Sequence, residues 1–290
     1  MTLIWGILNT TPDSFSDGGR YIDPEAAVAH ARLLRDQGAA IIDVGGESTR
    51  PGSERVTPAV EQARVLPVIE ALTAAGIPTS VDTLNAGTAV AAVRAGTRIV
   101  NDVSGGLADD RMLSAIADLD ADVAIGHWRG PSADMYARAQ YTRVAREVAS
   151  ELHERVAAAA AAGIAPSRVI VDPGVGFAKS GTQNWELLRD LDEITALGHR
   201  VLIGTSRKRF LAEVLDPSLR PADARSAHAT SSATQAIEQP ATSWTDEQRR
   251  DLATAVTSAL AARAGAWAVR VHDVAATRDA LEITAAWDGR

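Results

Sequence analysis

Eight short runs rich in Ile, Val and Leu recur along the 290 residues of this chain, and each has the length and composition of a strand buried on both faces. These runs span residues 3–8, 41–44, 79–81, 98–100, 122–125, 168–171, 200–203 and 268–271. Alanine-rich amphipathic stretches followed by or ending near a glycine lie between them, at residues 24–37, 58–75, 86–95 and 144–162. The alternation predicts a (β/α)8 TIM barrel, a single domain over residues 1–290, because a doubly wound sheet has fewer strands and needs a Gly-rich phosphate turn after the first.

A polar or charged side chain follows each predicted strand. The set is Asn9, Asp43 with Glu47, Asp82, Asn101 with Asp102, His127 with Arg129, Asp172, Ser206 with Lys208, and Arg270 with His272. In a barrel the carboxyl ends of all strands meet at one rim, where the active site lies. A single Asp after a strand is more often a turn or helix cap, but the repetition at every strand favours a site at this rim.

Two segments of the predicted rim suit an anion. Arg270 and His272 are two residues apart in a strand and therefore point to the same face, and two donors on one face suit a phosphate. The small-residue turn at 204–208 precedes a helix expected at 209–215, so its backbone N–H groups, with Ser206 and Lys208, could meet an anion or a polar ring. The alternative for this turn is an ordinary serine helix cap beside an exposed lysine.

Asp82, Asn101 and Asp172 present two carboxylates and an amide at three strand ends. Such a set suits a flat heterocycle with several N–H groups, whereas paired carboxylates are also the acid and base of glycoside hydrolysis. The glycine-rich segment 172–179 after the sixth strand is not a nucleotide phosphate loop, because its glycines lack the spacing of either phosphate-binding motif.

Composition narrows the classes of function. The 29 basic and 37 acidic residues leave a net charge of −8, so no global basic field would attract a nucleic acid or an anionic membrane. The absence of cysteine excludes disulfides, a thiolate nucleophile and cysteine metal sites, and it fits the cytoplasm. The first apolar run has no basic leader, so we expect no targeting segment. Lysine occurs only at Lys179 and Lys208.

Two segments resemble the signatures of one enzyme family. Residues 9–19, Asn-Thr-Thr-Pro-Asp-Ser-Phe-Ser-Asp-Gly-Gly, and 43–52, Asp-Val-Gly-Gly-Glu-Ser-Thr-Arg-Pro-Gly, are similar to the first and second signatures of the dihydropteroate synthases. Further segments at 82–83, 101–106, 172–177, 206–208 and 270–273 follow in the family's order. The resemblance implies a (β/α)8 barrel that joins 6-hydroxymethyl-7,8-dihydropterin diphosphate to p-aminobenzoate, releases pyrophosphate and makes 7,8-dihydropteroate for folate biosynthesis.

The resemblance also implies roles for individual residues. The pterin would be held by Asp82, Asn101, Asp172, Lys208 and Arg270, the last by stacking. The diphosphate would be held by Asn9, Arg270 and His272, with Mg²⁺ on Asn9. The p-aminobenzoate would be held by Phe15, Thr49, Arg50, Pro51, Phe177, Ser206 and Lys208. The catalytic set would be Asn9, Asp17, Arg50, Lys208, Arg270 and His272. Phe15, Asp17 and residues 49–51 would belong to mobile loops that close over the reactants.

The mechanism implied by the resemblance is a dissociative substitution. Ring nitrogens of the dihydropterin would stabilise a cation at the exocyclic carbon, so neutralising the leaving diphosphate assists C–O cleavage, and the neutral aryl amine then attacks. Sulfonamides, as mimics of p-aminobenzoate, would compete for its pocket. The family further implies a cytoplasmic homodimer that acts on small-molecule substrates.

Two features depart from the family pattern. Gly126 stands where the family commonly has a methionine that packs on the pterin, so we expect glycine to leave space there. Residues 222–249, before a helix expected to resume near Asp251, form a longer connection than usual, and we expect a mobile surface insertion. These departures leave a catalytically silent pterin-binding paralogue as one alternative. A methyltetrahydrofolate:corrinoid methyltransferase is the other, although it needs neither the diphosphate set nor the loop at 49–51.

Overall fold

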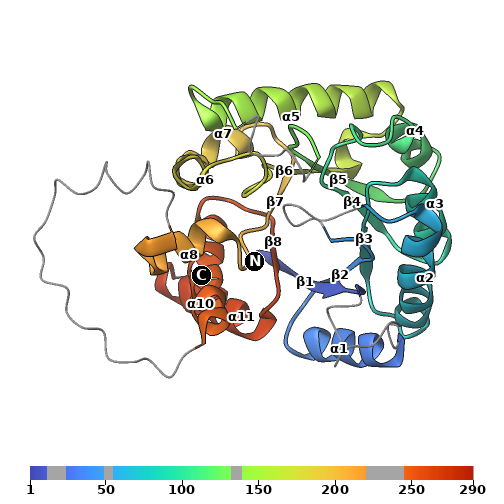
Figure 1. Cartoon of the computed structure of the whole chain (residues 1–290), viewed down its shortest axis with the longest axis horizontal. Coiled ribbons are helices and arrows are strands. Elements are labelled where there is room, and N and C mark those ends of the chain that lie inside the picture. The colour runs from blue at the N-terminus through green and yellow to red at the C-terminus, as the bar shows by residue number, and fades with distance from the viewer. Residues whose placement is uncertain (12–23, 49–54, 132–138, 220–244, 290) are drawn as a thin grey trace, which may run out of the picture.

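The sheet of the protein is a closed barrel of eight parallel strands that follow one another in chain order (Figure 1). The computed structural model describes residues 1–11, 24–48, 55–131, 139–219 and 245–289. The strands are β1 (Leu3–Asn9), β2 (Ile41–Gly45), β3 (Thr79–Asp82), β4 (Ile99–Asp102), β5 (Asp122–Gly126), β6 (Val169–Asp172), β7 (Arg200–Ile203) and β8 (Ala268–Val271). Pairing of β1 with β8 closes the sheet. The predicted (β/α)8 barrel is therefore confirmed.

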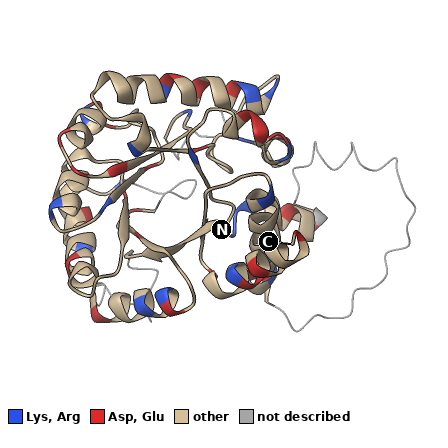
Figure 2. Cartoon of the chain, turned by 180° about the vertical axis from the view of Figure 1, so that it is seen from behind, with Lys and Arg blue, Asp and Glu red and all other residues tan. Residues whose placement is uncertain are grey.

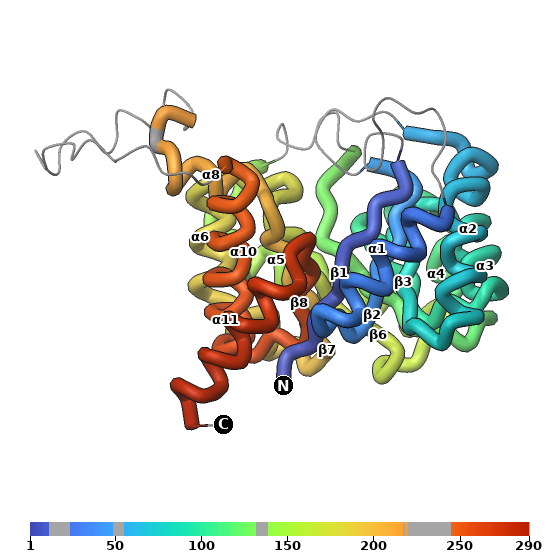
Figure 3. Tube along the Cα trace, turned by 90° about the horizontal axis from the view of Figure 1, so that it is seen from below, coloured from blue at the N-terminus to red at the C-terminus, as the bar shows by residue number. Residues whose placement is uncertain are grey.

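Helices surround the barrel on its outside (Figures 1 and 3). They are α1 (Pro24–Asp36), α2 (Pro58–Ala74), α3 (Ala86–Arg94), α4 (Met112–Ala117), α5 (Val144–Ala161), α6 (Gly181–Arg189), α7 (Asp192–Thr195), α8 (Arg209–Leu215), α10 (Asp246–Arg263) and α11 (Val274–Trp287), with 3-10 turns η1 (Pro166–Arg168) and η2 (Pro217–Leu219). Gly38, Gly96 and Gly163 follow helices with positive φ, as their positions predicted. Helices α4, α6, α7 and α11 add to the stretches that the sequence singled out.

Residues that face into the barrel change from apolar to polar along the strands. Near the amino-terminal end, the interior is filled by a buried cluster of Trp5, Ile41, Ile99, Ala124, Ile170, Leu202 and Ala268. Two residues further along, on the same face by alternation, lie Asp43 in β2, Asn101 in β4, Asp172 in β6 and Arg270 in β8. A larger apolar cluster fills the space between the sheet and the helices. The barrel interior is therefore apolar near the amino-terminal ends of the strands and polar at their carboxyl ends.

Helix α10 begins earlier than the sequence predicted. Thr245 Oγ1 accepts from Gln248 N at 3.2 Å, and Gln248 Oε1 accepts from Thr245 N at 2.9 Å, so the two residues form a capping box. The helix therefore starts at Asp246 and not near Asp251, and residues 246–249 do not belong to an insertion. The remainder of the expected insertion, residues 222–244, lies outside the described residues.

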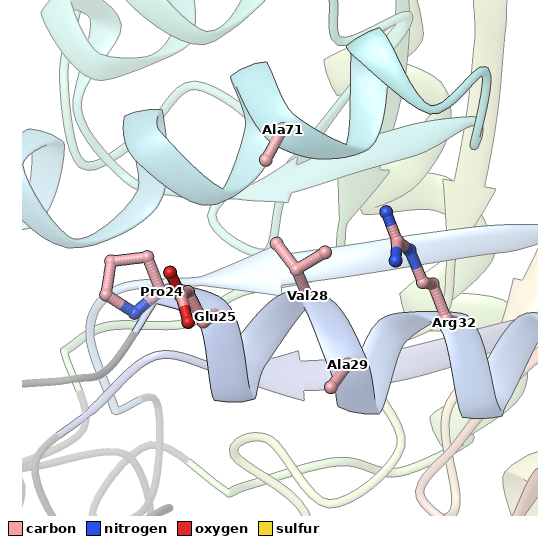
Figure 4. Close-up of a pocket in the computed structure, with 6 residues that line it drawn as sticks. All are labelled: Pro24, Glu25, Val28, Ala29, Arg32 and Ala71. Atoms are coloured by element: carbon pink, nitrogen blue, oxygen red, sulfur yellow. The ribbon is translucent and has the colours of Figure 1, made fainter.

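The outer surface carries charges of both signs, interspersed along the helices (Figure 2). Within the described residues, no helix is both long enough and apolar enough to cross a membrane. A shallow pocket of about 370 Å³ lies between α1 and α2 (Figure 4) and is lined by Pro24, Glu25, Val28, Ala29, Arg32 and Ala71. None of the residues predicted for the rim lines this pocket.

Candidate active site

Asp43 is the centre of a polar cluster inside the barrel. Its buried carboxylate accepts hydrogen bonds from Ser80 Oγ at 2.5 Å, Asn101 Nδ2 at 3.1 Å and Arg270 Nε at 2.5 Å. Arg270 also donates from Nη2 to Asp82 Oδ2 at 2.8 Å. The structure thus brings together Asp82, Asn101 and Arg270 around Asp43, which the sequence placed at the rim without an individual role in binding.

The charges of this cluster shift one another's ionisation. Burial raises the pKa of Asp82 to about 7; the Arg270 guanidinium opposes this shift, whereas the nearby Asp43 carboxylate adds to it. For Arg270, burial favours the neutral form, but Asp43 and Asp82 more than offset it and raise the pKa. Arg270 therefore stays charged, while Asp82 changes its protonation near neutral pH and can be either an acceptor-only carboxylate or a neutral acid.

Lys208 lies against the loop that follows β6. Its Nζ donates to the Val175 carbonyl and lies 4.5 Å from the centre of the Phe177 ring. Its stem runs past Gly176, where a Cβ would lie 2.7 Å from Lys208 Cδ and where φ is +82°, so both the space and the backbone require glycine. The structure brings Phe177 and Lys208 into contact, and their role in binding stays a prediction.

Burial also shifts the two ionisable groups near the end of β6. It raises the pKa of Asp172, against the charge of Lys208 and the hydrogen bond that Asp172 Oδ1 accepts from Gly174 N at 2.7 Å. Burial lowers the pKa of Lys208 to about 8, against the attraction of Asp172. Asp172, with a raised pKa, and Lys208, with a lowered pKa, thus lie at the same end of the barrel. Such a pair suits a ligand that carries both hydrogen-bond donors and acceptors.

Ser206 and His272 form a pair beyond the ends of β7 and β8. Ser206 Oγ lies 2.8 Å from His272 Nδ1, and it accepts from His272 N at 3.0 Å. The resemblance had assigned Ser206 to p-aminobenzoate and His272 to the diphosphate. Their direct contact places the two predicted subsites side by side.

The turn at 204–208 offers fewer backbone donors than its sequence predicted. The N–H of Arg207 donates to Thr254 Oγ1 at 3.1 Å, and the N–H of Lys208 donates to Thr205 O at 3.1 Å. Both groups are satisfied inside the protein. The expectation that the backbone N–H groups of this turn meet an anion is therefore wrong for these two residues.

Asn9 ends β1 beside Gly45 and Asp82. A Cβ at Gly45 would lie 3.6 Å from Asn9 Oδ1 and 3.9 Å from Asp82 Oδ2, so the absent side chain leaves a position close to both oxygens. Hard oxygen ligands suit Mg²⁺, which usually keeps several waters and binds substrate phosphates. Among the described residues, no three His, Cys, Asp or Glu side chains are grouped to hold a metal ion. The side chains here therefore fit Mg²⁺ only in company with a phosphate ligand.

Asp102 serves its own loop rather than the site. Its carboxylate accepts from Ser104 N at 2.8 Å and from Gly106 N at 2.6 Å. The common alternative for an Asp after a strand, a turn-forming residue, holds at this position.

The space expected at Gly126 is filled. A Cβ at this position would lie 2.5 Å from both Val103 Cα and Val103 O, in the loop after β4. The main chain of that loop thus occupies the space that a side chain at this position would take, and the expectation of an open space is wrong.

Five of the predicted site residues lie outside the described residues: Phe15, Asp17, Thr49, Arg50 and Pro51. The chain on either side of residues 49–54 is held together by a salt bridge of 2.8 Å between Arg55 Nε and Glu47 Oε1. Glu47, which the sequence placed at a strand end, thus serves to join these two points of the chain.

The chain is similar over nearly its whole length to proteins of known activity. The family model described as pterin binding enzyme matches residues 5–272. The dihydropteroate synthase of Mycobacterium leprae is 47% identical over 286 residues, which are 97% of this chain and 92% of that protein. The solved Xanthomonas albilineans dihydropteroate synthase with 4-aminobenzoic acid is 40% identical, covers 100% of this chain and 94% of that chain, and has a TM-score of 0.84. The Yersinia pestis dihydropteroate synthase, solved with a sulfonamide drug complex, is 31% identical, covers 100% and 95%, and has a TM-score of 0.85.

Proposed function

The chain belongs to the pterin-binding enzyme family, among the dihydropteroate synthases, and we propose that polar residues at its strand ends bind the two substrates. It is a transferase of folate biosynthesis that condenses 6-hydroxymethyl-7,8-dihydropterin diphosphate with p-aminobenzoate to give 7,8-dihydropteroate and pyrophosphate. The observation that carries the site is the buried cluster of Asp82, Asn101 and Arg270. Lys208 Nζ and Arg270 both lie near Gly204: a Cβ added to this glycine would be 3.8 Å from Lys208 Nζ and 4.0 Å from Arg270 Cβ. Lys208 therefore lies close to the cluster.

When the pterin binds, it replaces the hydrogen bond between Arg270 and Asp82. Ionised Asp82 accepts from N–H groups, and in the structure one of its oxygens is bonded to Arg270 at 2.8 Å. Arg270 also donates to Asp43 at 2.5 Å, so it can release Asp82 to the ligand and still keep a buried partner. Its planar guanidinium is then available to stack on the ring, while Asn101 and Asp172 complete the polar contacts.

The p-aminobenzoate ring packs against Phe177 and the stem of Lys208, which already lie side by side in the structure. The Ser206 hydroxyl, held by His272, receives its carboxylate. Sulfonamides compete for the same pocket because they present a similar ring and a similar polar end. The residues at 15 and 49–51 are proposed to complete this pocket.

The diphosphate lies between Asn9, Arg270 and His272. Arg270 lies in β8 and His272 directly after it, two residues further along the chain, so their side chains point to the same side. Both side chains can donate hydrogen bonds to a phosphate. Mg²⁺, with Asn9 Oδ1 as its protein ligand, would neutralise negative charge on the diphosphate. The contact between Ser206 and His272 supports an arrangement in which the diphosphate end of one substrate lies beside the p-aminobenzoate pocket.

These contacts support a dissociative substitution. Arg270 stays charged while buried, so it stabilises the negative charge that develops on the leaving diphosphate. The C–O bond to the diphosphate breaks first and leaves a cation at the exocyclic carbon. Lys208 and Phe177 hold the aryl amine against this carbon, so the amine then attacks it, forms the C–N bond and loses a proton to water. Asp17 and Arg50 are proposed to act from the loops that carry them.

The homodimer and the cytoplasmic location stay part of the proposal. Helix α10 presents Leu252, Val256 and Leu260 to solvent at a spacing of four residues, which places them in one stripe, and the neighbouring α11 presents Ile283 and Trp287. An exposed apolar surface of this kind suits a second copy of the chain. The absence of cysteine fits the cytoplasm.

Release of pyrophosphate tests the function directly. The purified chain, given the pterin diphosphate, Mg²⁺ and p-aminobenzoate, should release pyrophosphate and form dihydropteroate, and release should fall when p-aminobenzoate is withheld. A chain that binds the pterin in a calorimeter but releases no pyrophosphate would be a silent paralogue, and that result would falsify the proposal.

A further inference from the structure

Lys179 is a buried cation that none of the proposed substrate contacts uses. Lys179 is 1% exposed, and its Nζ lies 3.0 Å from each of three acceptors: His127 Nδ1, the Gly174 carbonyl oxygen and the Phe177 carbonyl oxygen. Burial lowers the pKa of Lys179 to about 7, against the attraction of Asp172. In its charged form the ammonium has three protons, and these three acceptors take all of them. Lys179 therefore ties the loop after β6 to the residue that follows β5.

The hydrogen bonds assign a proton to each group in this arrangement. His127 Nδ1 accepts from Lys179, so the imidazole proton lies on Nε2, which donates to Glu151 Oε2 at 3.0 Å. Burial and the charge of Lys179 lower the pKa of His127 to about 4, in agreement with a neutral ring. Burial opposes ionisation of Glu151, but hydrogen bonds from His127 and Arg129 more than offset it and lower the pKa to about 2. A continuous line thus runs from a carboxylate through a neutral imidazole to an ammonium.

The outer end of this line is held by Arg129. It donates from Nε to Glu151 Oε2 at 3.1 Å and from Nη1 to the Gln140 carbonyl at 2.7 Å, and its guanidinium lies 3.8 Å from the centre of the Tyr141 ring. Glu151 itself lies on α5, a helix of 18 residues. The line therefore starts on a long element outside the barrel and ends at the loop beside the substrates.

The loop after β6 turns one side to Lys179 and the other to the barrel mouth. The Gly174 and Phe177 carbonyls accept from Lys179, while the Val175 carbonyl between them accepts from Lys208. The Phe177 ring lies next to the same Lys208 ammonium. Loss of Lys179 would therefore shift both groups that Lys208 contacts in this loop.

We propose that Lys179 is a positioning residue: held by His127 and Glu151, it fixes the loop that carries Phe177 and thereby sets the affinity for p-aminobenzoate. This inference rests on the proposed function, in which the p-aminobenzoate ring packs on Phe177 and Lys208. Lys179 acts through the loop alone, because its three protons are used inside the protein.

The variant Lys179→Met keeps an apolar stem of similar length and removes the ammonium. Its KM for p-aminobenzoate should rise about tenfold or more, because hydrogen bonds from a charged donor are lost and the Phe177 ring shifts. Its KM for the pterin diphosphate should stay within about threefold, because Asp82, Asn101 and Arg270 lie on strands that Lys179 does not hold. Arg168→Met is the matched control, since Arg168 also donates to main-chain carbonyls, those of Ala121 at 2.9 Å and Leu119 at 2.7 Å, but just before β6. This control should lower the unfolding temperature and leave both KM values unchanged.

Two variants of His127 keep the test decisive if Lys179→Met does not fold. The amide oxygen of His127→Asn offers an acceptor near the position of Nδ1, so its KM for p-aminobenzoate should stay within about threefold of wild type, whereas His127→Leu should raise it about tenfold. An unchanged KM for p-aminobenzoate in Lys179→Met or His127→Leu overturns the inference, and so does an equal rise of both KM values. A wild-type chain that releases no pyrophosphate overturns the proposed function first and the inference with it.

Discussion

At the scale of single residues, Asp82 links the site to the stability of the fold. Its pKa in the folded chain is about 7 against an ordinary 3.8, so between these values the folded chain holds a proton that the unfolded chain has released. The stability that this proton contributes is fully present below about pH 4 and is lost as the pH rises through about 7. We therefore expect the unfolding temperature of Asp82→Asn to fall less than that of wild type between about pH 5 and pH 7, in scanning calorimetry. Equal slopes for the two proteins would assign the titration to other groups.

Asp82 and His272 should act on opposite ends of the pterin diphosphate. Asp82→Asn should weaken the binding of a pterin without phosphates by about tenfold, because a charge-assisted hydrogen bond is lost. His272→Ala should leave that affinity within about twofold and slow pyrophosphate release by about a hundredfold, because a donor to the leaving group is removed. Calorimetry with the phosphate-free pterin and the release assay measure the two effects. Similar losses of pterin affinity in both variants would argue against this division.

At the scale of elements, the loop after β4 depends on a glycine in β5. Gly126→Ala should lower the free energy of unfolding by about 1–3 kcal/mol, because its Cβ would lie 2.5 Å from Val103 Cα. Gly87→Ala in α3 is the matched control: its Cβ would meet nothing closer than Gln62 Nε2 at 3.8 Å, so it should raise that free energy by about 0.5–1 kcal/mol. Urea unfolding measures both. If Gly126→Ala were as stable as wild type, the loop would have to move aside without cost.

The elements themselves could largely be predicted. β7 and β8 have the predicted bounds, 200–203 and 268–271, because a short apolar run between turn residues identifies a buried strand without knowledge of its partners. The predicted start of α10, near Asp251, was wrong. The helix begins after a capping box of Thr245 and Gln248, and this box lies in a polar stretch without the regular spacing of apolar residues that indicates a helix. The rim also followed from the sequence, since strand ends in a barrel always meet.

At the scale of the whole molecule, the exposed apolar stripe on α10 beside α11 predicts a dimer. The two helices pack against each other at one side of the barrel (Figures 1 and 3), and Trp287 on α11 is 82% exposed. Wild type should sediment as a dimer and Leu260→Arg as a monomer, because an arginine would be buried in the contact without a partner. Leu107→Arg, at a leucine 49% exposed in the loop after β4, should stay dimeric. A monomeric wild type would contradict this interface.

Neighbouring residues along the chain were enough to predict the barrel and the rim that carries Asp82, Asn101, Asp172 and Arg270, because alternation and strand-end position are local properties. The partners of the buried charges depended on the closed fold. Arg270 meets Asp43 across 227 positions of sequence, and Lys179 meets His127 across 52. A buried charge must find a hydrogen-bonding partner wherever the closed barrel places one, and no local pattern in the sequence identifies that partner.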